Sequence, residues 1–212
     1  MKKAIAPHFI RTEKQLAVMA SAARQEIVDV LAEMGTVSVA ELAATLGRPA
    51  DALYFHLRAL KAAGLVCQSG YRSRGGRKEA LFRTVAPDLR LHYEPRSITN
   101  RRAVSAIVSS MLRLGIRDFR RAFRGDEVAV SGPRRELWAW RKTGRLSEAD
   151  LEGVNRSIMS LVSAVSRPQG KGRLYGVTVL LTPLDHRGRE TKHRTKAPKV
   201  RQENAPGRRI TD

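Results

Sequence analysis

A short stretch in the first half of the chain concentrates cations in a way that suits contact with phosphate. The five cations of residues 72–83 are Arg72, Arg74, Arg77, Lys78 and Arg83. The only acid among them is Glu79. Like charges this close repel one another unless an anion lies opposite them, and the backbone of a nucleic acid is such an anion. A solvated, charged loop without a ligand is the alternative.

A second group of useful side chains recurs at helical spacing just before this stretch. Leu53, Leu57 and Leu60 form a narrow apolar stripe, so most of the circumference of such a helix stays free. The candidate DNA-facing residues of this helix are Ala50, Asp51, Tyr54, Phe55, His56, Arg58 and Lys61. Their mixed chemistry suits a helix in the major groove of DNA. A helical hairpin inside an ordinary bundle would give the same apolar stripe.

Residue types that catalyse reactions or bind metals do not form recognisable groups. Cys67 is the only cysteine, and the histidines have no metal-ligand spacing. These histidines are His8, His56, His92, His186 and His193. For His56 we expect a local hydrogen bond or a phosphate contact. The chain has no Gly-rich phosphate loop and no nucleophile beside a base, so we predict no enzyme activity, no metal site and no cofactor.

The local sequence predicts two short helices that would present these side chains. Ser38 and Glu41 have the spacing of a capping box and predict a helix through residue 46. Gly47 ends that helix, and Pro49 is well placed as the first residue of the next. A longer helix is predicted upstream over residues 13–34 from its apolar spacing.

The cationic stretch itself is predicted to be a β-hairpin. Residues 65–72 and 79–84 have strand character, and Gly75 and Gly76 permit a tight turn between them. Helix, helix, turn, helix and basic hairpin therefore follow one another in this part of the chain.

Residues 54–66, YFHLRALKAAGLV, resemble the His-Leu-x-x-Leu-x-x-Ala-Gly-Leu-Val signature of ArsR-type bacterial transcription regulators. The resemblance covers residues 16–85 and implies a winged helix-turn-helix, an architecture that MarR- and PadR-type regulators share. It also implies that residues 49–63 form the recognition helix, although Tyr54 stands where the family often has a DNA-facing Ser. Residues 38–42, SVAEL, stand where metal-sensing members have Cys-Val-Cys-Asp-Leu, so the resemblance implies no soft-metal sensing.

A second long helix is predicted over Ile98–Phe123, after a linker at residues 87–97. Its apolar residues, among them Ile107 and Met111, would form the seam of a homodimer. A single winged helix covers too few base pairs for useful specificity, which favours this interpretation. The alternative is that the helix packs only on its own C-terminal domain.

The following residues predict a small α/β unit. Residues 136–143 and 174–182 have strand character, and Ser147 with Asp150 predicts a capped helix between them. Several ArsR-like regulators are similar here, with strand, helix and a strand ending in Leu-x-Pro. Trp138, Trp140 and Tyr175 are expected in the core, with an effector pocket as the alternative.

Composition completes the picture of a basic, α+β protein. The chain has 212 residues, 40 Lys and Arg and 20 Asp and Glu, for a net charge of +20, which favours nucleic-acid partners. No apolar run would cross a membrane, and charges interrupt the N-terminal region that imitates a signal peptide. A lone cysteine fits the cytoplasm.

The predicted segments are a basic leader (1–12), a winged helix-turn-helix (13–86), a linker (87–97), a dimerisation helix with an α/β unit (98–185) and a disordered basic tail (186–212).

From these patterns we expect a sequence-specific, DNA-binding transcription regulator, most simply a homodimeric repressor that occupies a double-stranded operator. The alternative is a basic accessory protein that binds RNA or the ribosome. Neither the operator nor any small-molecule effector follows from the sequence.

Overall fold

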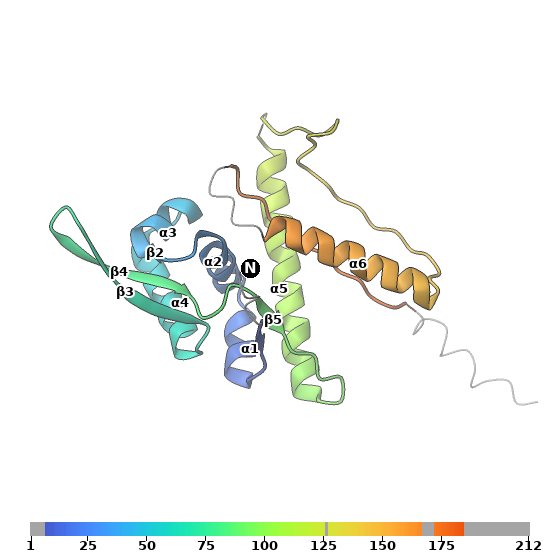
Figure 1. The fold of residues 1–212 in the computed structure, drawn as a ribbon, viewed down its shortest axis with the longest axis horizontal. Helices are drawn as coiled ribbons and strands as arrows, with labels where there is room; N and C mark the ends of the chain where they lie inside the picture. Colours follow the sequence, from blue (N-terminus) through green and yellow to red (C-terminus); the bar gives the residue numbers. More distant parts are fainter. Residues whose placement is uncertain (1–6, 126, 167–171, 185–212) are drawn as a thin grey trace, which may run out of the picture. The chain divides into compact units, whose positions relative to one another are not determined.

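The computed structural model describes residues 7–125, 127–166 and 172–184, with the backbone alone at residue 77 (Figure 1). This part of the chain contains six helices and five strands, so the predicted α+β class is confirmed. The chain divides into two compact units, residues 1–178 and 179–212, and all these helices and strands belong to the first.

The helix predicted over residues 13–34 is in fact two helices, α1 (Glu13–Met19) and α2 (Ala22–Met34). A capping box begins α1, in which Thr12 Oγ1 accepts a hydrogen bond from the Gln15 amide at 3.2 Å. Ser21 has an extended backbone (φ −109°, ψ 123°) and precedes α2. The single-helix prediction was wrong because the apolar spacing continues through this break and no Gly or Pro marks it.

The next two helices, α3 (Val39–Leu46) and α4 (Ala50–Ala62), confirm the predicted pair. Ser38 Oγ accepts a hydrogen bond from the Glu41 amide at 3.3 Å, and Glu41 Oε2 accepts one from the Ser38 amide at 2.8 Å. Gly47 ends α3 in the left-handed conformation (φ 61°, ψ 38°), which a side chain would disfavour. Pro49 precedes α4 as its N-cap and is not its first helical residue, a shift of one position from the prediction.

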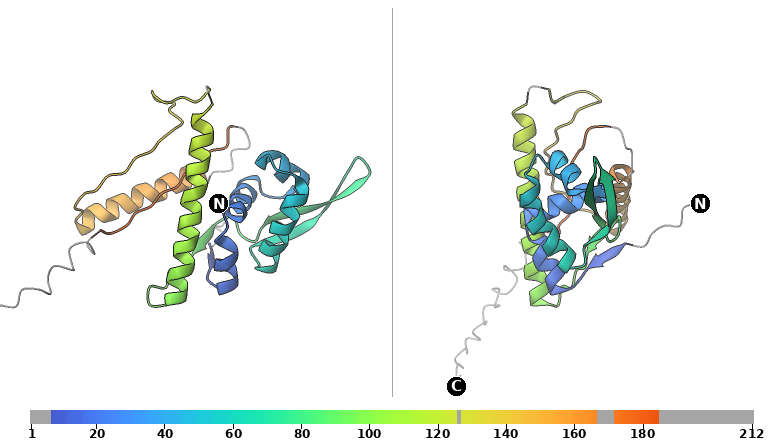
Figure 2. Two further views of the ribbon diagram at one scale, coloured as in Figure 1. Left: turned by 180° about the vertical axis from the view of Figure 1, so that it is seen from behind. Right: turned by 90° about the vertical axis from the view of Figure 1, so that its left-hand side faces the viewer.

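A three-stranded antiparallel sheet follows, in the order β2-β4-β3. Its strands are β2 (Val37–Ser38), β3 (Val66–Arg74) and β4 (Arg77–Thr84). Gly75 and Gly76 form the two-residue turn between β3 and β4 with φ of 56° and 76°, as a tight hairpin requires. We call the β3–β4 hairpin the wing, because it projects beyond the helices (Figures 1 and 2).

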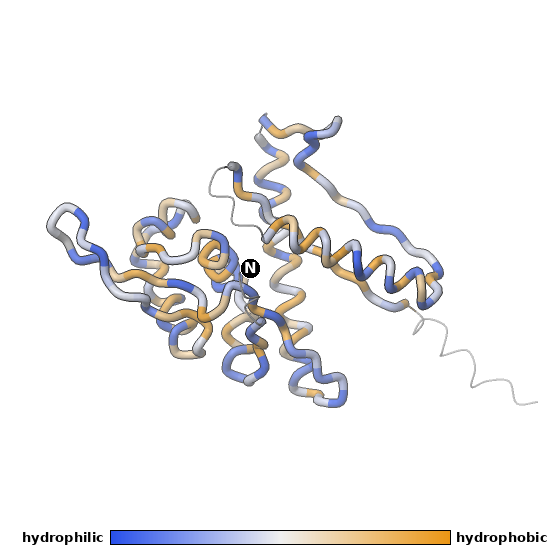
Figure 3. The backbone as a smooth tube through the Cα atoms, viewed as in Figure 1, coloured by the Kyte–Doolittle hydropathy of each residue, from blue (hydrophilic) through white to orange (hydrophobic). Residues whose placement is uncertain are grey.

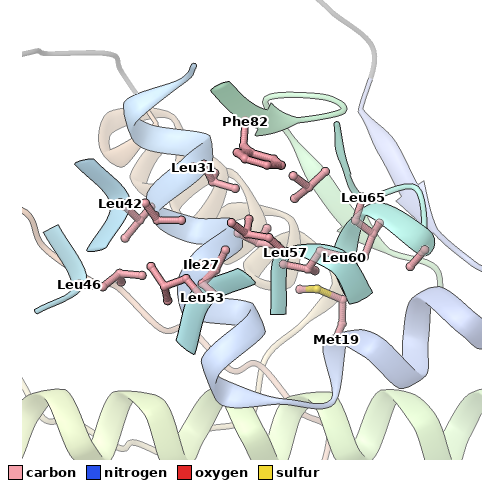
Figure 4. Packing of buried hydrophobic residues seen from close by; sticks show 14 of the residues in the cluster. Met19, Ile27, Leu31, Leu42, Leu46, Leu53, Leu57, Leu60, Leu65 and Phe82 are labelled. Atoms are coloured by element: carbon pink, nitrogen blue, oxygen red, sulfur yellow. The ribbon is translucent and has the colours of Figure 1, made fainter. Parts of the chain in front are cut away.

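A single apolar core holds the helices against the sheet. Leu53, Leu57 and Leu60 of α4 are at most 1% exposed and pack with Ile27 and Leu31 of α2 (Figure 4). Burying each side chain of this size contributes about 1.5–3 kcal/mol, so the narrow stripe of α4 is enough to fix the helix in place. The rest of its surface is left for other contacts.

The long helix α5 (Ile98–Phe123) has the predicted bounds, and its first half contributes to the same core. Val104 and Ile107 are buried in this core, where α5 contacts α1 and α2, and Gln25 Nε2 of α2 donates a hydrogen bond to the Ile107 carbonyl at 3.1 Å. The prediction that Ile107 faces a second copy was therefore wrong. Periodicity identifies an apolar face but does not identify what covers it.

A short parallel pair of strands ties together two segments for which no structure was predicted. β1 (His8–Ile10) lies in the expected leader, and β5 (Leu89–Leu91) lies in the expected linker. Ile10 is only 2% exposed and joins the core. Strands of three residues paired across some eighty positions leave no local pattern that could reveal them.

In the C-terminal region, α6 (Glu148–Val165) confirms the predicted capped helix. Ser147 Oγ accepts a hydrogen bond from the Asp150 amide at 3.2 Å. The strands predicted at 136–143 and 174–182 are not present, and both stretches are irregular. Strand propensity forms a strand only where another strand offers its backbone, and these stretches pair with none in the described part of the chain.

The aromatic side chains of this region are on the surface. Trp138 and Trp140 are 68% and 77% exposed, so the expectation that they belong to a core was wrong. The Arg135 guanidinium lies 4.2 Å from the ring centre of Trp138, and the Tyr175 hydroxyl donates a hydrogen bond to Glu136 Oε1 at 2.5 Å. The tail predicted at 186–212 lies outside the described residues. None of the described helices is both long and apolar enough to span a membrane.

Candidate nucleic-acid interface

The part of α4 that the core does not cover has an outward side and two flanks. The turn of about 100° per residue assigns each side chain to one of them. Asp51, Phe55 and Arg58 lie opposite the leucine stripe and are exposed, Phe55 by 63%. Together they offer an acceptor, an aromatic face and a cation. Such a set can distinguish donors, acceptors and methyl groups on base edges. Ala50, at the first turn, is partly buried, and its small side chain lets a partner approach the end of the helix.

Tyr54 and Lys61 lie on the flank of α4 that adjoins the sheet. Tyr54 is 47% exposed, and Lys61 Nζ donates a hydrogen bond to Gln68 Oε1 of β3 at 3.4 Å. This long contact between α4 and β3 brings the flank of the helix next to the wing. Tyr54 therefore belongs to the side of α4 that faces the wing, while Phe55 and Arg58 point outward.

His56 lies on the opposite flank and is half-buried. Its ring meets the Phe55 ring edge-on, with 5.5 Å between centroids and 72° between planes. Its Nδ1 is buried and has no hydrogen-bond partner among the described residues, so the expected local hydrogen bond does not form. Burial lowers the pKa of His56, and the charges of Arg24 and Arg48 lower it further, so this side chain is neutral at physiological pH.

Arg72 of the wing forms ion pairs with two acids of its own chain. Its Nη2 lies 2.8 Å from Glu41 Oε1 and 3.5 Å from Glu79 Oε2. The hydrogen bond to Glu41 is the main cause of a raised pKa for Arg72. The sequence grouped Arg72 with the candidate phosphate-binding cations, and the structure shows that it also pairs with two acids of its own chain. It connects β3 of the wing to the start of α3.

Glu41 is therefore shared between two elements. One carboxylate oxygen caps α3 at the Ser38 amide, and the other binds Arg72. These contacts lower the pKa of Glu41, with the backbone hydrogen bond at Ser38 as the larger cause. The capping residue of the helix-turn-helix is thus also the residue that orients the wing.

Arg74 and Lys78 remain exposed toward the tip of the wing. The Lys78 ammonium lies 4.4 Å above the ring of Tyr71, which is 57% exposed. Tyr71 was not among the candidate residues predicted from the sequence. Its position, as an aromatic residue among cations in a predicted strand, could have identified it. Arg77 begins β4 directly opposite Arg74, and its side chain lies outside the described residues.

The turn between α3 and α4 is also held by charge. Arg48 forms an ion pair with Glu26 of α2, and Arg117 of α5 reaches the other oxygen of the same carboxylate. Hydrogen bonds to Glu26 and Asp118 raise the pKa of Arg117, the former being the larger cause. One acid on α2 therefore connects the turn before α4 to the long helix.

The comparison with known protein families agrees with this geometry. A family model described as a helix-turn-helix domain matches residues 19–67, from the last residue of α1 to the second residue of β3. No curated protein matches the chain. In helix-turn-helix domains the second helix of the pair lies in the major groove, which corresponds to α4 here, and such domains are typical of DNA-binding regulators.

Proposed function

We propose that this protein is a homodimeric transcriptional repressor of the ArsR-like winged helix-turn-helix type. In this proposal α4 enters the major groove of a double-stranded operator, and the wing follows the adjacent backbone. Dimerisation doubles the number of base pairs that one α4 can read, as operator specificity requires. Occupying the operator excludes polymerase, which is the simplest route to repression.

The observation that carries the proposal is the uncovered, mixed surface of α4. A helix that only binds phosphate needs cations, yet Asp51 and Phe55 stand at the centre of this surface. An acid there repels phosphate, and it can accept a hydrogen bond from cytosine. The chemistry of α4 therefore supports reading of base edges.

Within this proposal the candidate residues have two tasks. Ala50, Asp51, Tyr54, Phe55 and Arg58 would meet bases, and Lys61 and His56 would lie at the edges of the contact. Arg74, Arg77 and Lys78 would contact phosphates. Arg72 would stabilise the wing through its ion pairs with Glu41 and Glu79. A helix-turn-helix domain binds nucleic acid without catalysis, which supports a non-enzymatic function.

The rival function is that of a basic, RNA- or ribosome-associated protein, and the net charge of +20 favours it. A competition experiment between DNA and RNA distinguishes the two functions. Genomic DNA fragments selected by the protein should share a sequence, and excess structured RNA should not displace them. Displacement by RNA at equal mass would support the rival instead.

The direct test compares Tyr54→Ala with Arg74→Ala on the selected fragment and on random duplex, each titrated with salt. Tyr54→Ala should cost about 1–3 kcal/mol on the selected fragment and far less on random DNA, because it removes a base contact. Arg74→Ala should weaken both alike and reduce the salt slope by roughly one, because it removes a phosphate contact.

Glu13→Ala is a matched control, since Glu13 is exposed on α1 and outside this surface. Equal loss on both DNAs for Tyr54→Ala, with loss only on the selected fragment for Arg74→Ala, would reverse the tasks of helix and wing. If no fragment is selected above random DNA, the repressor proposal fails.

A further inference from the structure

The second half of α5 carries an apolar stripe that its own domain does not cover. Leu112, Ile116 and Phe123 are 38%, 51% and 67% exposed, and the Phe119 and Phe123 rings stack at 5.9 Å. At 100° per residue these four side chains lie on the side of the helix opposite Ile107 and Leu114, which face the core. In Figure 3 hydrophobic and charged residues alternate along this part of α5.

Cations border this stripe along one edge. Arg113, Arg120 and Arg124 follow one another within about 40° of turn, next to Ile116, and they line a shallow hollow with it. A surface that only binds phosphate does not need large exposed apolar side chains between its arginines. The chemistry of this surface fits an amphipathic helix with an acidic edge.

Among the described residues, α6 is such a helix, and none of its residues is buried. Its apolar stripe consists of Leu151, Val154, Ile158, Leu161, Val162 and Val165. In a chain of net charge +20 this helix is acidic, with Glu148, Asp150 and Glu152 against Arg156. At 100° per residue, Glu148 and Glu152 border one edge of the stripe.

We propose that α6 of one copy packs on the second half of α5 of another copy, so that two equivalent contacts form across a twofold axis. The proposal rests on the homodimer of the proposed function and specifies which surfaces form it. The apolar stripes of α5 and α6 cover each other, while Glu148 and Glu152 of one copy face Arg113 and Arg120 of the other. A single chain leaves both stripes exposed, whereas a monomer rarely exposes apolar patches of this extent.

Two charge reversals test this arrangement on the full chain. The α5 reversal is Arg113→Glu with Arg120→Glu, and the α6 reversal is Glu148→Lys with Glu152→Lys. Each alone should weaken self-association in sedimentation about tenfold or more, because both contacts of the dimer then oppose like charges. Mixing the two variants should restore a dimer, because every contact in the mixed pair joins opposite charges. Arg134→Glu with Arg141→Glu makes the same change in net charge as the α5 reversal, at exposed positions outside α5, and should not weaken association.

A second comparison tests the apolar contact. Leu161→Asp should weaken the dimer, while Ser160→Asp, on the opposite side of α6, should not. Both positions are exposed in the single chain, so neither change should lower its melting temperature at concentrations where it is monomeric.

The outcomes separate this inference from the proposed function. Dimers that survive both reversals and bind a selected operator would overturn the α5–α6 contact and leave the repressor intact. Recovery only when both reversals are in one chain would overturn it too, because α6 would then pack on its own α5. A wild-type protein that stays monomeric and selects no DNA sequence would overturn both proposals.

Discussion

Glu41 is a single residue whose carboxylate connects two elements of the fold. Its carboxylate caps α3 at Ser38 and holds Arg72 of the wing at 2.8 Å. A capping box was predictable from the spacing of Ser38 and Glu41, because it depends only on neighbours in sequence. The contact with Arg72 was not predictable, because it joins residues from separate elements. Residue types alone made Arg72 look like its neighbour Arg74.

The lowered pKa of Glu41 gives its contribution a definite pH range. Its ordinary pKa is 4.5, and the folded protein holds it below that value. Stability from Glu41 is therefore fully present above about pH 5 and is lost as the pH falls through the folded pKa. We expect Glu41→Gln to reduce the free energy of unfolding at pH 7 and to make it fall less steeply below pH 4.5 than in the wild type. Urea unfolding between pH 3 and 7 measures both, and an unchanged pH profile would contradict the prediction.

Asp51 is the comparison residue for this measurement. It is an exposed acid in the first turn of α4, outside the capping box and the Arg72 pair. Asp51→Asn breaks neither contact of Glu41, so it should leave the free energy of unfolding at pH 7 nearly unchanged and should alter DNA selection instead. Opposite results for the two substitutions would mean that Glu41 belongs to the DNA surface and Asp51 to the scaffold.

Among elements, α5 has two functions along its length. Its first half is core, with Ile107 buried at 3% exposure, and its second half displays Ile116 at 51%. Both residues belong to one continuous helix whose bounds the sequence predicted correctly. The hydrophobic pattern does not show which residues are covered: α1 and α2 contact α5, and Ile116 lies on the side of the helix opposite the buried Ile107.

The two isoleucines should therefore respond differently to truncation. Ile107→Ala should cost about 2–5 kcal/mol of stability at any protein concentration, because it leaves a cavity in the core of the same chain. Ile116→Ala should cost little in dilute solution, and its effect should grow as the concentration rises into the dimeric range. Denaturant midpoints at two protein concentrations separate the two, and a concentration-dependent loss for Ile107→Ala would contradict the assignment.

Elements that depend on local signals were predictable, and those that depend on distant partners were not. α3, α4, α6 and the wing follow from caps, glycines and short-range periodicity. The β1–β5 pair escaped prediction because each strand has three residues and no signal of its own. The opposite error occurred at 174–182, where strong strand propensity has no neighbouring strand in the described chain. The exposure of the candidate residues of α4 followed from its narrow stripe, but their division into outward and flanking groups required the neighbouring sheet.

At the scale of the whole molecule, we expect the net charge and the exposed surface of α4 to make separate contributions to DNA affinity. The net charge of +20 adds attraction to any duplex, while the exposed surface of α4 supplies a mixed chemistry in one place. Residues 186–212 contribute nine Lys or Arg against three acids to this charge. We therefore expect this segment to add affinity for any duplex without adding sequence information.

Deleting residues 186–212 should lower affinity for the selected fragment and for random duplex together. The salt slope should decrease by roughly 0.9 for each cation that had contacted phosphate, and the ratio of the two affinities should stay the same. Fluorescence anisotropy at three salt concentrations measures both quantities. If the ratio falls, the segment reads sequence and is not merely an electrostatic aid.

The geometry of the wing also limits how its reach can be altered by protein engineering. Gly75 and Gly76 join strands in which Arg74 lies directly opposite Arg77. Because strand side chains alternate between the two faces, adding one residue to each strand would turn the tip cations to the other face. Adding two to each strand would keep their orientation and move them outward by about 7 Å. A longer wing that keeps its tip cations on the same face can therefore be built only in steps of two residues per strand.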